Sequence, residues 1–141
     1  MTQVHFLHGA QDRIQAAAAW IGAAWDRRTP VTVFAPHRDL ADRLDRQLWI
    51  APALGFIPHC RQNSPLAGET PIVITDSLDP TQPQQCLLNL SDEIPPEFQR
   101  FETLVEIVST EENVRTQARD RVRHYKEMNC PVQFEDISHG R

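Results

Sequence analysis

Basic side chains are concentrated in one segment of an otherwise acidic chain. The 141 residues have a net charge of −5, and nearly all of the basic residues are arginine. The segment from Asn113 to Lys126 holds five basic residues and one acidic residue, so it has a charge of +4 and leaves the rest at −9. Guanidinium groups form paired hydrogen bonds with carboxylates. The segment therefore indicates a site for a small acidic partner, rather than for a DNA duplex, which needs a broad basic surface.

These basic residues fall along one side of a predicted helix over residues 111–128. At about 100° per residue, a basic stripe borders an apolar face, and Val122 lies at the seam between them. The stripe consists of Arg115, Arg119, Arg123 and Lys126, and the apolar face of Val114, Ala118, Val122, Tyr125 and Met128. Two interpretations stay open: a solvated charged face, or a shallow groove for an acidic peptide that ends in apolar residues.

Histidine and cysteine are too scattered to indicate a metal site. The six histidines and three cysteines include no Cys-x-x-Cys, and the adjacent His59 and Cys60 lack further ligands at a suitable spacing. Separated cysteines suit a reducing compartment, and no stretch resembles a signal peptide or a membrane span. We therefore expect a cytoplasmic protein that binds neither a metal nor another cofactor.

No sequence motif for catalysis or for nucleotide binding is present. The turn after the first predicted strand, His8-Gly9-Ala10-Gln11-Asp12, has a single glycine, whereas phosphate-binding turns need several. The chain also lacks Gly-Lys-Ser/Thr and Gly-x-Ser-x-Gly. We expect no intrinsic catalysis, and a small nucleotide-binding enzyme on the same fold is the alternative.

An apolar loop from Trp49 to His59 is the second unusual feature. It combines Trp49 and Phe56 with the rigid residues Pro52 and Pro58. Loops normally avoid so much apolar surface, so it must pack into a core or against a partner. Two interpretations are equally good: Trp49 plugs one end of the core, or the loop forms the centre of an interface.

The elements that must position these residues alternate between strand and helix. Periodicity predicts strands over residues 4–7, 31–35, 71–75, 86–90 and 104–108, and helices over 11–27, 37–48 and 111–128. Residues 50–70 are expected to form a loop. The pattern predicts an α/β protein: one Rossmann-like domain over residues 1–141, with a mostly parallel sheet, helices on both faces and no nucleotide-binding loop. Pro131 ends the last helix, and residues 131–141 are expected to form a loose tail.

Several of these segments together resemble a known family. Leu44-Asp45-x-x-Leu48-Trp49-x-x-Pro52, then Phe56-Ile57-Pro58-His59 and Pro71-Ile72-Val73-Ile74, are similar to the chi subunit of bacterial DNA polymerase III. The resemblance extends over essentially the whole chain, including the final basic helix. It implies a Rossmann-like fold without nucleotide-binding activity, in a non-catalytic adaptor subunit of the clamp-loader assembly that takes part in DNA replication.

The resemblance also implies two protein partners. It places a psi subunit, which would form a heterodimer with this chain, against a surface that includes Trp49, Pro52, Phe56, Pro58 and His59. It places the acidic C-terminal tail of single-stranded DNA-binding protein against Arg115, Arg119, Val108 and Val122. Contact with DNA would be indirect, and none with a membrane is implied. Whether a helicase also uses the psi-facing surface stays open.

Two residues depart from the family pattern at the implied tail site. Val122 stands where the family has a tyrosine, and Arg115 stands where it has a lysine. The second change keeps the positive charge. The first keeps an apolar side chain but removes an aromatic surface on which a partner could stack.

Overall fold

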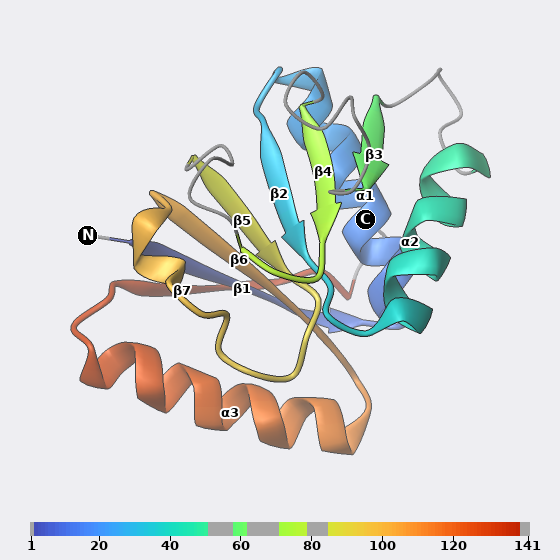
Figure 1. Ribbon diagram of the computed structural model, residues 1–141. Helices are drawn as coiled ribbons and strands as arrows, with labels where there is room; N and C mark the ends of the chain where they lie inside the picture. The colour runs from blue at the N-terminus through green and yellow to red at the C-terminus, as the bar shows by residue number, and fades with distance from the viewer. Residues whose placement is uncertain (1, 51–57, 62–70, 79–84, 139–141) are drawn as a thin grey trace.

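A single parallel sheet of seven strands organises the computed structural model, which describes residues 2–50, 58–61, 71–78 and 85–138 (Figure 1). The strand order is β3-β4-β2-β5-β6-β1-β7, and every pair of neighbours is parallel. The strands are β1 (Gln3–Ala10), β2 (Val31–Phe34), β3 (His59–Arg61), β4 (Ile72–Thr75), β5 (Cys86–Asn89), β6 (Thr103–Ser109) and β7 (Val132–Asp136). The predicted α/β class is therefore confirmed.

Helices cover both faces of the sheet. They are α1 (Arg13–Asp26), α2 (Arg38–Ile50), the short 3₁₀ helix η2 (Phe98–Arg100) and α3 (Glu112–Glu127). The side chain of Asp12 caps α1 by accepting a hydrogen bond from the backbone N–H of Gln15. At the other end of the chain, Asn129 adopts a left-handed φ of 63°, which turns the backbone out of α3 and toward β7. No described helix has the length and apolar character needed to cross a membrane.

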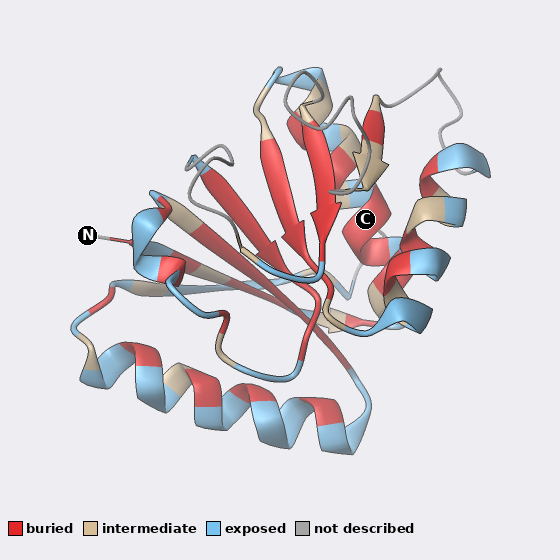
Figure 2. Cartoon of the chain, viewed as in Figure 1, coloured by how far each residue is buried: buried red, intermediate tan, exposed pale blue. Residues whose placement is uncertain are grey.

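Two separate apolar cores form, one on each face of the sheet. One lies beneath α1 and α2 and includes Val105 and Ile107 of β6, and the other lies beneath α3 and includes Leu104 and Val108 of the same strand. Figure 2 shows buried residues along the central strands and on the inward side of α3. Because successive side chains of a strand alternate between faces, β6 contributes to both cores.

Two predicted irregular segments contain strands. His59–Arg61, predicted as loop, forms β3 beside β4, and Val132–Asp136, predicted as a loose tail, forms β7 beside β1. Both are edge strands, and every residue of β7 after Val132 is exposed. Backbone hydrogen bonds to a neighbour create these strands. Their side chains therefore show little of the apolar pattern by which a strand is recognised in a sequence.

Candidate functional site

A groove of about 460 Å³ lies where β6, β1 and β7 end beside α3. Its lining includes Val108, Arg115, Arg119 and Val122, the four residues predicted for the tail site. Since all strands run in parallel, their carboxyl ends lie on the same side of the sheet. This is where parallel α/β proteins commonly bind ligands. The fold thus brings all four together, with Val108 buried at the end of β6 and both arginines exposed on α3.

The two groove arginines lie one helical turn apart and point to solvent. Within the part of the chain that the structure describes, neither Arg115 nor Arg119 forms an ion pair. Arg123 differs, because its guanidinium lies 3.7 Å from the carboxylate of Asp120, an exposed i,i+3 pair. The groove arginines can therefore take up carboxylates of a partner without first breaking a bond within the chain.

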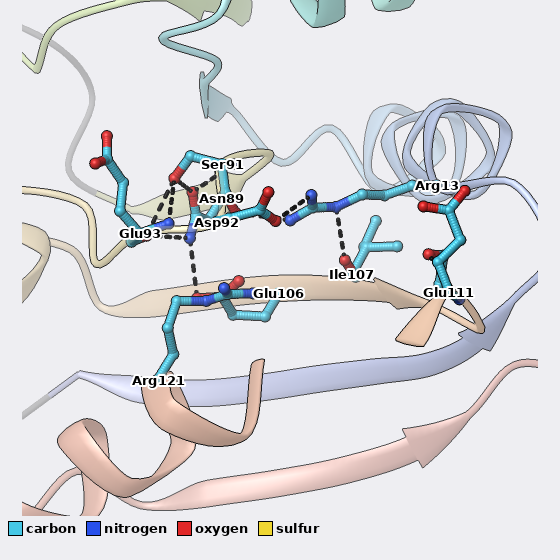
Figure 3. Close-up of polar contacts among 10 residues, drawn as sticks. Arg13, Asn89, Ser91, Asp92, Glu93, Glu106, Ile107, Glu111 and Arg121 are labelled. Atoms are coloured by element: carbon cyan, nitrogen blue, oxygen red, sulfur yellow. Dashed lines mark hydrogen bonds and ion pairs between the residues drawn. The ribbon is translucent and has the colours of Figure 1, made fainter. Parts of the chain in front are cut away.

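Arg121 is the basic residue that the helix-wheel argument left out, and it points the opposite way. Its side chain is 3% exposed, and its Nε donates to Oε2 of Glu106 on β6 over 3.1 Å. The hydroxyl of Tyr125 and Nδ2 of Asn89 donate to the same oxygen. Figure 3 shows Arg121 reaching from α3 to Glu106. Because Arg121 is neutralised inside the protein, the charge that the segment offers to a partner is +3 rather than +4.

This buried cluster holds α3 against the sheet. Burial and the adjacent Glu106 carboxylate raise the pKa of Tyr125 above its ordinary value of 10.0, so the phenol stays protonated and keeps donating. Oε1 of Glu106 and both Nη atoms of Arg121 find no hydrogen-bond partner in the described parts of the chain. A buried charge pair of this kind is costly to break, since removing one partner leaves the other uncompensated.

Hydrogen bonds on the other side of β6 attach α1 to the same region. Arg13 of α1 donates from Nε to the backbone oxygen of Ile107 and from Nη2 to that of Ser91, and it pairs with Asp92 at 3.0 Å (Figure 3). Burial lowers the pKa of Arg13, whereas the carboxylates of Asp92 and Glu106 raise it. Polar anchors thus join β6 to helices on both faces of the sheet.

Gly9, predicted to lie in the first turn, is instead part of β1, where it allows β7 to close against this strand. Gly9 has a φ of 85°, and a Cβ at this position would lie 2.8 Å from Oδ1 of Asp136 and 3.1 Å from Cβ of Ser138. A side chain would therefore clash with the end of β7. The backbone N–H of Ile137 also donates to the oxygen of His8 over 2.8 Å. The glycine therefore serves packing between β1 and the end of β7.

The opposite edge of the sheet exposes apolar side chains at the end of α2. Trp49 is 62% exposed and Ile50 is 71% exposed. The interpretation that Trp49 plugs the core is therefore wrong, because most of its surface lies in solvent. Pro52 and Phe56, predicted for the same surface, lie outside the described residues, and Pro58 is half-buried.

His59 lies beneath this surface and supports it. Its side chain is 1% exposed, so it offers almost no contact area to a partner, contrary to its predicted place in the interface. Its Nε2 lies 2.9 Å from Oδ1 of Asp45, and its ring meets that of Trp49 edge to face with centroids 5.1 Å apart. Arg61 extends the polar contacts to Asp42 at 2.9 Å. These bonds tie β3 to α2 and set the position of Trp49.

Phe134 is one of the groove residues that the sequence prediction missed, and it is the most exposed apolar one. It lies on β7, lines the groove and is 56% exposed. A signal was present, since Val132 and Phe134 have the spacing of one strand face after Pro131 ends the helix. Two apolar residues at this spacing are too few to distinguish a strand from an irregular exposed tail.

Comparisons with known proteins identify the family of the chain. Residues 1–133 match the family model described as DNA polymerase III chi subunit, HolC. The chain is also similar to the DNA polymerase III subunit chi of Pseudomonas aeruginosa, with 29% identity over 121 residues, which covers 86% of this chain and 84% of the relative. The chain therefore belongs to the DNA polymerase III chi subunit family, which consists of accessory subunits of the replication machinery.

Proposed function

We propose that this protein is a non-catalytic adaptor in the cytoplasmic replication machinery. One edge of its sheet binds the psi subunit of the clamp loader, and the groove at the other edge binds the acidic C-terminal tail of single-stranded DNA-binding protein. The adaptor would bring the clamp loader to coated single strands without touching DNA itself.

The observation that supports the tail site most directly is the groove beside α3. It combines two exposed arginines, Arg115 and Arg119, with the apolar Val108 and Val122, all within one concave site. An acidic peptide with an apolar end needs both kinds of contact: guanidinium groups for its carboxylates and an apolar wall for its last side chain.

The psi site is supported by the exposed end of α2. Trp49 is a large aromatic side chain in solvent, set in place by a buried histidine and its aspartate. A rigidly held aromatic is typical of the residues that contribute most to a permanent interface, because little side-chain entropy is lost on binding.

Titration with a synthetic peptide tests the tail site. The probe bears several aspartates and ends in Pro-Phe with a free carboxylate. We expect calorimetry to give a dissociation constant on the order of micromolar, which weakens as salt is added. Arg115→Ala combined with Arg119→Ala should reduce the affinity by about a hundredfold, at roughly 1.4 kcal/mol for each tenfold step.

Arg123→Ala is the matched control for this titration. Arg123 lies on the same helix but outside the groove lining and pairs with Asp120, so its loss should change the affinity by less than about threefold, as for an exposed pair. Arg115→Ala and Arg119→Ala are also titrated one at a time, and an affinity loss for Arg123→Ala equal to theirs would mean that only the overall charge of α3 matters. Unchanged binding by the double variant would disprove the site.

A further inference from the structure

Phe134 is unusual among the exposed residues of this chain. The large apolar side chains with most exposure among the described residues are Trp49, Ile50 and Phe134, and only Phe134 lines the groove beside α3. The other two lie at the end of α2, and the strand order places β7 and β3 at opposite edges of the sheet. An exposed aromatic within a concave, partly apolar site is a feature that binding would bury.

The ring of Phe134 is held by neighbours on two elements. Its centroid lies 5.9 Å from that of the buried Phe6 on β1, and Nζ of Lys126 on α3 lies 5.9 Å from the ring centroid. Phe6 belongs to the core beneath α3. A ring supported in this way presents a fixed apolar surface. Little side-chain entropy of Phe134 is therefore lost when a ligand packs against it.

The groove therefore has two chemically different walls. On α3, Arg115 and Arg119 provide positive charge next to Val122, and on β7, Phe134 provides an aromatic surface. The acidic exception is Asp136, whose Oδ1 accepts a hydrogen bond from the backbone N–H of Ser138 at the end of β7. Charge and apolar surface together suit the end of an acidic peptide whose last residue is aromatic.

We propose that Phe134 is the residue that selects an aromatic side chain at the C-terminus of the bound peptide. In this arrangement the last side chain packs on Phe134 while Arg115 and Arg119 hold the carboxylates. The inference rests on the proposed tail-binding function and deepens it. Specificity for the last residue then comes from β7, and charge attraction comes from α3.

A double-mutant cycle tests the contact. Two peptides differ only in their last residue, Phe or Ala, and each is titrated into the unaltered protein and into Phe134→Ala. We expect Phe134→Ala to weaken the Phe-ending peptide about tenfold, or about 1.4 kcal/mol, and to change the Ala-ending peptide by less than about twofold. An equal loss for both peptides, or no loss for either, overturns the proposal.

Salt dependence separates the two walls. For Phe134→Ala the affinity should fall with salt as steeply as in the unaltered protein, with a constant offset, because the lost contact is uncharged. Arg115→Ala with Arg119→Ala should instead flatten the dependence. If those arginine changes abolish binding while Phe134→Ala has no effect, the proposed function stands and this inference fails. If the unaltered protein binds neither peptide, the proposed function itself fails.

Gln133→Ala is the matched control on β7. Gln133 is exposed, lies on the opposite face of the strand and is absent from the groove lining. Its loss should leave both titrations unchanged. Phe134→Leu keeps apolar bulk against Phe6 and replaces Phe134→Ala if that variant does not fold. It should retain binding, but it should no longer prefer a peptide that ends in Phe over one that ends in Leu.

A crosslinking experiment uses the unaltered protein. A peptide with benzoylphenylalanine as its last residue should label the segment 132–136 on irradiation, and labelling confined to other segments overturns the proposal. A second copy of this chain is the competing occupant of the groove, and sedimentation tests it by measuring whether the protein forms dimers. Dimerisation that Phe134→Ala abolishes would assign the exposed ring to self-association instead.

Discussion

The two edges of the sheet offer different surfaces for binding. At the β3 edge, Trp49 and Ile50 project from the end of α2 with most of their area in solvent. At the β7 edge, a groove combines exposed arginines with a half-covered phenylalanine. Apolar exposure favours a partner that stays bound, because the surface is unfavourable in water, whereas charge favours a partner that arrives quickly and leaves.

The supports beneath the two surfaces differ as well. Beneath Trp49, a partly exposed Asp45 bonds to the buried His59, at the boundary between α2 and a strand of three residues. Beneath the groove helix, the pair of Arg121 and Glu106 is almost fully buried. The orientation of α3 therefore depends on a charge pair that water cannot replace, and the α2 edge depends on a contact that is partly in solvent.

The largest expected effect comes from breaking the buried pair. Arg121→Ala leaves Glu106 uncompensated in the interior, and we expect the free energy of unfolding in urea to fall by about 3–5 kcal/mol. Peptide affinity at the groove should also fall, because α3 loses its anchor. Arg121→Met combined with Glu106→Gln should recover part of the stability, because no charge is left uncompensated and the amide oxygen can still accept from Tyr125 and Asn89. If Arg121→Ala costs less than about 1 kcal/mol, the pair does not hold α3 as we infer.

Trp49→Ala should have the next largest effect, and only at the other edge. We expect psi pairing, measured by co-purification and calorimetry, to weaken by about 2–4 kcal/mol, the range of a central interface aromatic. The midpoint of unfolding should barely change, since Trp49 is mostly exposed. Phe134→Ala serves as the control, because it removes an exposed aromatic at the opposite edge and should leave psi pairing intact. Loss of pairing with both variants would mean that the two edges do not act separately.

The smallest expected effect is a loss of stability in alkaline solution. Burial raises the pKa of Cys86 from its ordinary value of 9.0 to about 12, so the folded protein keeps this thiol protonated where the unfolded chain releases the proton. Its contribution to stability is therefore complete below pH 9.0 and is lost progressively as pH rises toward about 12. Urea unfolding at several alkaline pH values should show a shallower decline for Cys86→Ala. An identical decline would assign the effect to Tyr125 and Cys130, whose pKa values are also raised by burial in the other core.

The helices and inner strands could be predicted because their signals are local. Ile14, Ala17 and Ile21 of α1, and Val31 and Val33 of β2, are buried as their spacing indicates. The groove lining was predicted in part, since Arg115, Arg119 and Val122 share one region of a single helix. The position of Val108 beside them rested on a family resemblance, because it requires β6 and α3 to meet.

The sequence by itself determined the α/β class, the basic helix and the apolar end of α2, because repeats of two and of three to four residues follow from backbone geometry alone. Only the tertiary structure decided three further points: the strand order, the burial of Arg121 against Glu106, and the place of Phe134 on an edge strand beside the groove. Each depends on pairing between segments that lie far apart in the chain. Such pairing is selected by the packing of the whole protein, and residue spacing within one segment does not encode it.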